Sequence, residues 1–142
     1  MDGVAEPEIL VTSLARIPTA GGDVLHAMKR QEPGFTDFGE AYFSLVNGGA
    51  VKAWKRHLRM TMNIVVPVGR VRFVFRQNAA DTFRVEDIGS DRYVRITVPP
   101  GIWFGFQGRS DSQSLVLNIA SLPHDRNEVE RLGVSEFKYA WS

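Results

Sequence analysis

Residues 49–69 read GAVKAWKRHLRMTMNIVVPVG, and this stretch decides the expected fold of the chain. Residues 61–68 are rich in β-branched side chains, which favour strands. Residues 67–70 contain a proline and a glycine and predict a turn. Val71, Phe73 and Phe75 then alternate with arginines, which is the period of a strand with one buried face. The stretch therefore predicts two strands joined as a half-buried hairpin.

Later segments repeat the period-two pattern. Residues 93–98 alternate, and the two prolines that follow end this strand, because proline cannot donate to a β-ladder. Residues 115, 117 and 119 are apolar and predict the buried face of another strand. Residues 126–132 predict a short helix, and residues 1–20 predict an N-terminal arm or an edge strand. Short strands with few helical periods favour an all-β sandwich or barrel.

The composition limits the number of domains and the class of partner. A chain of 142 residues with 44% hydrophobic side chains suits one domain over residues 1–142. The net charge of +1 is too weak to attract nucleic acid or an anionic membrane. The absence of cysteine excludes disulfides and thiolate metal sites and fits the cytoplasm. The first residues have no basic start and no long apolar run, so we expect neither a signal peptide nor a membrane span.

The stretch 49–69 also resembles the first signature of the cupin family, in which a glycine and five residues precede H-x-H, a glutamate and a second glycine. Lys55 replaces the first histidine, Met62 the glutamate, and Phe104 the last histidine ligand of the family. Only His57 remains. One imidazole beside these side chains cannot hold iron, manganese or zinc, so we expect neither a metal nor another cofactor.

Together with residues 98–106, VPPGIWFGF, the stretch resembles the metal-free cupins of deoxysugar biosynthesis. These are the dTDP-4-dehydrorhamnose 3,5-epimerases, with R-G-L-H and P-x-G-x-x-H-G-F motifs, and the dTDP-sugar 3,4-ketoisomerases, with R-G-x-H-x-H. The resemblance extends over residues 22–131 and implies a cupin jelly-roll barrel. It also implies a homodimer that acts on a nucleotide-linked 4-keto sugar.

The catalytic residues of the epimerases are not kept. Their base is the first histidine, held by a carboxylate near the C-terminus, and a tyrosine is the usual acid. Here the base position is Lys55, no acidic residue follows Glu136, and His124 stands near the position of the tyrosine. We therefore do not expect the usual pair of residues for 3,5-epimerisation.

Lys55 and His57 are two residues apart on a predicted strand, so both should point to the same face. The resemblance to the cupin motif implies that this face is the interior of the barrel. A desolvated lysine beside other cations could remove an α-proton or form a Schiff base, with His57 as its electrostatic partner. Alternatively, Lys55 only binds a diphosphate or a carbonyl group, and His57 is a hydrogen-bonded core residue. Lys52 has the opposite parity and replaces an arginine that contacts the phosphates in the family.

Six other residues are candidates for substrate binding. Glu40 and Tyr42 form one polar row with Ser44, at the position of a pocket-lining strand in the family, although an outward row would look the same. Arg72 could face either side of its strand. Phe104 could stack on the substrate or belong to the core. His26 could enter the pocket of the neighbouring subunit or lie on an exposed edge strand. His124 could be the acid or only cap the short helix.

The sequence thus predicts a homodimeric, metal-free cupin that acts as an epimerase or isomerase on a nucleotide-linked 4-keto sugar. Such an enzyme would serve the biosynthesis of surface polysaccharide or deoxysugars. One alternative is a catalytically degenerate cupin that binds a nucleotide sugar or another anionic sugar without turnover. Another is an unrelated β-sandwich interaction domain, in which the candidate residues would lie on the surface.

Overall fold

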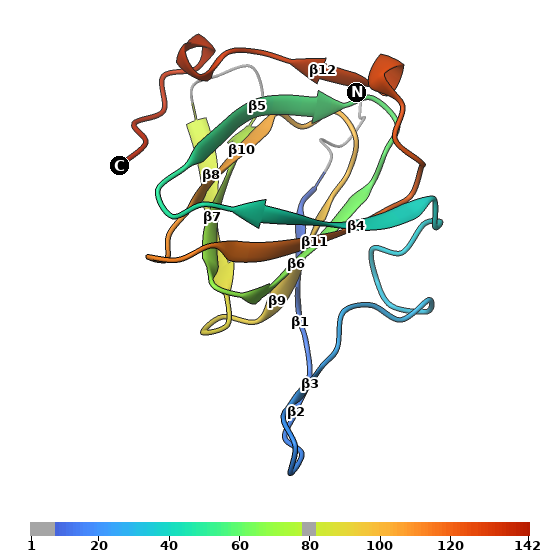
Figure 1. Cartoon of the computed structure of the whole chain (residues 1–142). Helices are drawn as coiled ribbons and strands as arrows, with labels where there is room; N and C mark the ends of the chain where they lie inside the picture. The colour runs from blue at the N-terminus through green and yellow to red at the C-terminus, as the bar shows by residue number, and fades with distance from the viewer. Residues whose placement is uncertain (1–7, 78–81) are drawn as a thin grey trace.

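The computed structural model describes residues 8–77 and 82–142, which form two antiparallel five-stranded sheets facing each other (Figure 1). The β4 sheet has the order β1-β9-β6-β11-β4, and the β5 sheet has the order β12-β5-β10-β7-β8. Strands that are neighbours in space are mostly distant in sequence, as in a jelly roll. The described residues contain no α-helix, and the predicted all-β jelly-roll class is confirmed.

The strands of the β4 sheet are β1 (Leu10–Ser13), β9 (Val94–Val98), β6 (Met62–Val68), β11 (Ser114–Ala120) and β4 (Glu40–Val46). Those of the β5 sheet are β12 (Val129–Arg131), β5 (Val51–His57), β10 (Phe104–Gly108), β7 (Arg70–Gln77) and β8 (Thr82–Gly89). A small hairpin of β2 (Arg16–Ile17) and β3 (Val24–Leu25) projects from the barrel (Figure 1). β1 is an edge strand, one of the two forms expected for residues 1–20, and residues 1–7 lie outside the described part.

The hydrophobic core fills the space between the two sheets. Phe73, Phe75 and Phe104 of the β5 sheet belong to one buried cluster with Ile64 and Ile96 of the β4 sheet. The Phe75 ring lies 6.4 Å from the Phe73 ring and 6.5 Å from the Phe104 ring, measured between centroids. Each buried side chain of this size contributes about 1.5–3 kcal/mol to folding. This cluster therefore holds the two sheets together and packs against the inner face of β10 through Phe104.

The prediction of a hairpin around Gly69 is wrong, because the two strands that flank Gly69 do not pair with each other. β6 and β7 are strands, but β6 pairs with β9 and β11, whereas β7 pairs with β8 and β10. Gly69 alone separates them, and the shortest common hairpin loops need two residues. The chain therefore crosses from one sheet to the other at Gly69, whose φ of 90° suits glycine.

β11 is also turned opposite to the expectation. Its buried row consists of Ser114, Val116, Asn118 and Ala120, whereas Leu115, Leu117 and Ile119 are half-buried on the outer face. The buried row contains two polar residues and the outer row is entirely apolar, so the alternation pointed to the wrong face. The outer face of the β4 sheet is consequently apolar.

Residues 126–132 were expected to form a helix, but only the first three residues are helical. A 3-10 turn spans η1 (Arg126–Glu128), and the chain then extends as β12. β12 pairs with the otherwise open edge of β5, so backbone groups that a helix would satisfy internally are satisfied by the sheet. After a second 3-10 turn, η2 (Val134–Glu136), the C-terminal aromatic side chains cover Trp54 on the outer face of β5.

Candidate active site

A bulge between β5 and β10 brings two lysines to the same side of the sheet. Lys55 lies opposite Phe104 and Lys52 opposite Phe106, and the register shifts between these pairs. Because one extra residue sits on β5, two side chains of opposite sequence parity reach the same face. Lys52 was expected on the opposite face from Lys55, and this expectation is corrected by the bulge.

The two lysines line a pocket of about 340 Å³ together with a third cation. Arg131 of β12 pairs in register with Lys55, so its side chain lies on the same face. Among the described residues, none of the three cations forms an ion pair with a carboxylate. The pocket is therefore suited to an anion. Its complete lining is Lys52, Ala53, Trp54, Lys55, Phe104, Phe106, Arg131 and Leu132.

The ammonium group of Lys55 is placed where its proton is held weakly. Its Nζ lies 5.6 Å from the centroid of the Phe104 ring, at the apolar side of the pocket. Burial lowers the pKa of Lys55, and the positive charges of Arg131 and Lys52 lower it further. Lys55 consequently loses its proton to form the neutral amine more readily than an exposed lysine does.

A buried pair of His57 and Glu128 lies beside this pocket. His57 is 6% exposed and Glu128 only 1%. His57 Nδ1 is hydrogen-bonded to Glu128 Oε1, and Glu128 Oε2 accepts hydrogen bonds from the backbone N–H groups of Arg59 (3.0 Å) and Met60 (3.1 Å). The His57 ring stacks on Phe104, with centroids 6.4 Å apart. The carboxylate thus ties the end of β5 to the η1 turn.

The surroundings shift the pKa values of both members of this pair. Burial lowers the pKa of His57, although Glu128 opposes this shift, and the lowered pKa favours the neutral imidazole. Burial raises the pKa of Glu128, but hydrogen bonds from His57, Arg59 and Met60 outweigh it and hold the pKa below its ordinary value. A carboxylate can only accept, so Nδ1 carries the proton and Nε2 has a lone pair. Nε2 has no hydrogen-bond partner among the described residues.

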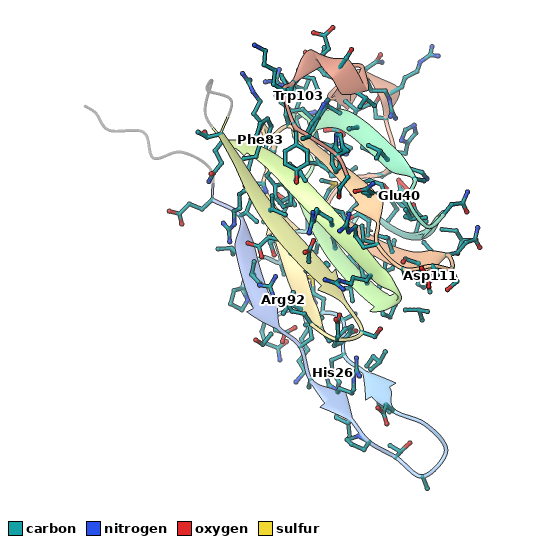
Figure 2. The ribbon with its side chains drawn as sticks, turned by 90° about the vertical axis from the view of Figure 1, so that its left-hand side faces the viewer. His26, Glu40, Phe83, Arg92, Trp103 and Asp111 are labelled. Atoms are coloured by element: carbon teal, nitrogen blue, oxygen red, sulfur yellow. The ribbon has the colours of Figure 1, made fainter. Side chains whose placement is uncertain are left out.

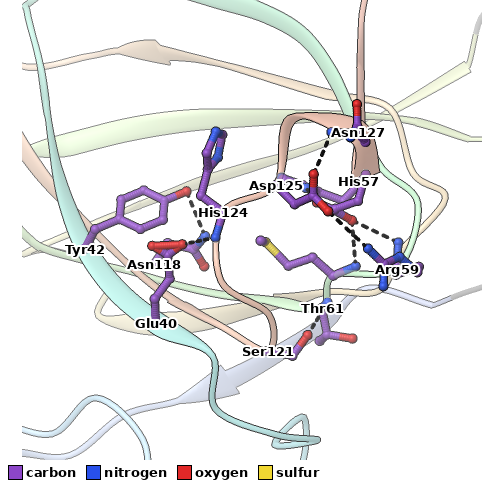
Figure 3. A network of polar contacts seen from close by, with 12 residues as sticks. Glu40, Tyr42, His57, Arg59, Thr61, Asn118, Ser121, His124, Asp125 and Asn127 are labelled. Atoms are coloured by element: carbon purple, nitrogen blue, oxygen red, sulfur yellow. Dashed lines mark hydrogen bonds and ion pairs between the residues drawn. The ribbon is translucent and has the colours of Figure 1, made fainter.

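The opposite wall of the barrel carries a second polar group (Figure 3). Tyr42 pairs in register with the buried Asn118, and its hydroxyl accepts a hydrogen bond from Asn118 Nδ2 at 3.1 Å. Glu40 accepts a hydrogen bond from the backbone N–H of His124. Figure 3 shows Glu40, Tyr42, Asn118 and His124 gathered at the β4 side, while His57 lies on the opposite side of the view.

The predicted site residues Arg72 and His26 lie away from both the cationic pocket and the polar group on the opposite wall. Arg72 is on the outer face of the β5 sheet, bound to Asp87 through two hydrogen bonds of 2.7 and 2.9 Å, so its expected place in the pocket is corrected. Its neighbours Val71 and Phe73 take the inward positions. His26 follows the projecting hairpin, and Figure 2 places it at the end of the molecule opposite Trp103. Trp103 lies beside β5, under Arg56.

Sequence reasoning missed Glu128 and Asn118. Glu128 was assigned to a short helix, and its meeting with His57 joins positions 71 residues apart. The alternation of residues 115, 117 and 119 predicts an outward position for Asn118, but Asn118 lies in the buried row. Ser114 lies in the same row, so no local pattern marked Asn118 as buried.

The described residues contain neither a cluster of metal ligands nor a membrane-spanning helix. Within residues 8–77 and 82–142, no group of three His, Asp or Glu side chains could hold a metal ion. No helix in the same ranges is long and apolar enough to cross a bilayer.

Comparison with known proteins finds a relative of known structure with substantial sequence identity. A dTDP sugar isomerase from Desulfovibrio desulfuricans G20 is 35% identical, with 94% of this chain and 90% of that chain covered and a TM-score of 0.87. The probable low-salt glycan biosynthesis epimerase Agl13 of Haloferax volcanii is 31% identical over 94 residues, which is 60% of this chain. The match spans 58% of the length of that curated relative. No family model matches the chain.

More distant structures show the same fold. QdtA, a sugar 3,4-ketoisomerase from Thermoanaerobacterium thermosaccharolyticum, is 15% identical with a TM-score of 0.74, and the alignment covers 87% of this chain and 88% of that chain. The dTDP-6-deoxy-D-glucose-3,5-epimerase RmlC from Legionella pneumophila Philadelphia 1 is 12% identical with a TM-score of 0.77, covering 90% and 74%. An unrelated β-sandwich is therefore excluded. The chain belongs to the dTDP-sugar isomerase family, within the RmlC-like cupin jelly rolls.

Proposed function

We propose that the chain is a metal-independent cytoplasmic isomerase or epimerase that moves a proton beside the keto group of a nucleotide-linked 4-keto sugar. The observation that carries this proposal is the buried His57–Glu128 pair, which leaves a neutral Nε2 without a partner in the described chain. Such an imidazole is a general base, and its carboxylate stabilises the imidazolium that forms. The activity of the family relative supports the same class of reaction.

The cationic pocket supports an anionic substrate. Lys52 and Arg131 line its wall, and we propose that they bind the diphosphate of the nucleotide sugar. The keto sugar would then reach inward past Phe104, on which the His57 ring stacks. Binding through these cations would be similar in the ground and transition states, so their loss should raise KM more than it lowers kcat.

We propose Tyr42 as the acid on the opposite wall. Its hydroxyl accepts a hydrogen bond from Asn118, which leaves the phenolic proton free to be donated. A base on one sheet and an acid on the facing sheet would act on opposite faces of a sugar ring, which epimerisation needs. Glu40 and His124, linked through the His124 backbone, would shape the entrance beside Tyr42.

Solvent exchange tests this function directly. dTDP-4-keto-6-deoxyglucose is incubated with the protein in deuterated water, and NMR follows deuterium beside the keto group. The wild type should exchange, with or without a chelator, and His57→Asn should slow exchange by ~10²–10⁴-fold. Glu130→Gln is the matched control, because Glu130 pairs with Arg56 on the outer face. Full exchange in His57→Asn would contradict the assignment of the base.

A second candidate function is binding without turnover. It is favoured by Lys55 and Phe104, which stand where the cupin family has histidines. Nucleotide-sugar binding measured by calorimetry, combined with no exchange in the wild type for any 4-keto sugar, would establish this alternative.

We also propose that the chain acts as a homodimer. The outer face of the β4 sheet exposes Phe43 (63%) and Leu45 (57%), and an exposed apolar surface of this kind marks an interface. The β2–β3 hairpin exposes Ile17 and Val24, and an isolated two-stranded hairpin is only marginally stable in water. In such a dimer, His26 at the end of the hairpin would approach the pocket of the neighbouring subunit.

A further inference from the structure

We propose that Lys55 is a covalent catalyst, whose amine forms an imine with the carbonyl carbon of the bound keto sugar. This inference rests on the proposed function, because it needs a keto sugar in the pocket. It gives Lys55 a role distinct from that of His57, instead of making the two side chains alternative bases.

The first support is the position of the amine. Lys55 is the residue on the inner face of β5 that lies opposite Phe104, and it lines the pocket of about 340 Å³. Its Nζ reaches across the Phe104 ring rather than toward a carboxylate. An amine held on an apolar floor, in a cavity large enough for a sugar ring, can approach a carbonyl carbon without displacing an ion pair.

The second support is the cluster of cations around Lys55. A lysine becomes a nucleophile when it is desolvated or placed beside another cation, since both disfavour the ammonium form. Lys52 and Arg131 line the same pocket and provide the neighbouring charges. The lowered pKa of Lys55, caused by burial and then by Arg131 and Lys52, agrees with this geometry.

The third support is that His57 can carry the proton, so Lys55 does not have to act as the base. His57 Nε2 is free of partners in the described residues, and its ring packs on the same Phe104 that lies under Lys55. Imine chemistry needs such a group, because protons must be moved while the amine is covalently occupied. Lys55 and His57 can therefore work in sequence.

The reaction balances without an oxidant or a reductant. The neutral amine adds to the carbonyl carbon, and the alkoxide takes a proton to give a carbinolamine. Loss of the hydroxyl as water, with one proton supplied, leaves an iminium ion. His57 Nε2 then removes a proton from the adjacent carbon to give an enamine, which is more accessible than an enolate because the iminium nitrogen accepts the electron pair. Reprotonation and addition of water return the isomerised ketone and free Lys55.

Reductive trapping tests the inference. The protein is mixed with dTDP-4-keto-6-deoxyglucose and sodium cyanoborohydride, which reduces iminium ions in preference to ketones. Intact mass spectrometry should show one adduct equal to the sugar nucleotide minus water plus two hydrogens. Peptide mapping should place it on Lys55 among the lysines at positions 29, 52, 55 and 138.

Matched variants make the result specific. Lys55→Met keeps the length and apolar stem of the side chain, and it should lose the adduct and slow solvent exchange while remaining folded by circular dichroism. His57→Asn should still form the adduct but lose exchange, because imine formation precedes removal of the α-proton. Lys138→Ala, a change of an exposed lysine outside the pocket, should retain both.

The outcomes separate this inference from the proposed function. Exchange in the wild type without any adduct on Lys55 would overturn the imine and leave the isomerase standing. An adduct on Lys55 without exchange would support the imine and contradict the isomerase. Absence of both, with substrate binding shown by calorimetry, would overturn both. Adducts spread equally over the lysines would also overturn the imine, since they would show that the pocket does not activate Lys55.

Discussion

The chemistry of the site depends on what surrounds single residues rather than on their identity. Glu128 is almost fully buried, which is costly for a carboxylate unless hydrogen bonds compensate. Here two backbone N–H groups and the imidazole of His57 provide them. The same hydrogen bond fixes the tautomer of His57, and the Nε2 without a partner among the described residues is the reason why we propose this buried histidine as the base.

The pH dependence of exchange should report on this pair. His57 must be neutral to accept a proton, so exchange should fall as the pH drops through the pKa of His57, which lies below its ordinary value. Glu128 opposes that lowering by stabilising the imidazolium. Glu128→Gln should therefore shift the acidic limb to lower pH and reduce the rate at neutral pH, because the imidazole becomes a weaker base.

A pH–rate profile and ¹⁵N NMR of the histidines measure this effect. Glu130→Gln changes the charge equally two residues away and should leave the acidic limb in place. An acidic limb that moves to higher pH in Glu128→Gln would show that the carboxylate does not stabilise the imidazolium.

At the scale of the elements, the two faces of β5 have different roles: the inner face lines the pocket, and the outer face packs against the C-terminal segment. Its inner face carries Lys52 and Lys55 into the pocket. Its outer face carries Trp54, which packs against Phe137 (5.3 Å) and Trp141 (5.4 Å) and donates a hydrogen bond from Nε1 to the Val134 backbone oxygen at 3.1 Å. The C-terminal segment therefore supports the strand that presents the lysines.

Gly105 is the position where this packing can be tested. An added Cβ would lie 2.6 Å from Ala53 Cβ and 3.2 Å from the Trp141 ring, so β5 or the C-terminal segment would have to move. Gly105→Ala should lower the free energy of unfolding by about 1–3 kcal/mol, as expected for overpacking. It should also weaken nucleotide-sugar binding, because the lysines sit on the displaced strand.

Urea denaturation and calorimetry provide the two readouts. Gly133→Ala is the control, because an added Cβ there meets no atom within 4 Å and the backbone φ of −69° is ordinary. Gly105→Ala with wild-type stability and affinity would show that the contact with β10 does not position β5.

At the scale of the whole molecule, the cationic pocket and the exposed apolar face of β4 lie on different surfaces. The chain is nearly neutral, with a net charge of +1, yet three cations line one pocket. Exposed apolar residues lie outside this pocket on the outer face of β4 (Phe43 and Leu45) and on the β2–β3 hairpin (Ile17 and Val24). Ligand capture and self-association are thus expected at different surfaces.

The homodimer is tested by light scattering at micromolar concentration. The expected mass is about twice that of the 15.9 kDa chain, because a dimer would bury both apolar surfaces. Phe43→Lys should shift the protein toward the monomer, since it places a charge on the apolar face. A change at an exposed polar site, Gln113→Lys, is the control. A monomeric wild type would also remove His26 from any site.

The sequence alone determined the all-β class and most of the strands, because alternation is a local property of neighbouring residues. Alternation also placed Lys55 and His57 on one face, and the resemblance to the cupin motif identified it as the inner face. The spacing of the two motifs was enough to identify the jelly roll. Only the tertiary structure decided that Lys52 joins Lys55, because a bulge shifts parity in a way that no local pattern marks. It also decided that Gly69 is a crossing between sheets and that Glu128 meets His57, since both depend on how distant strands pair.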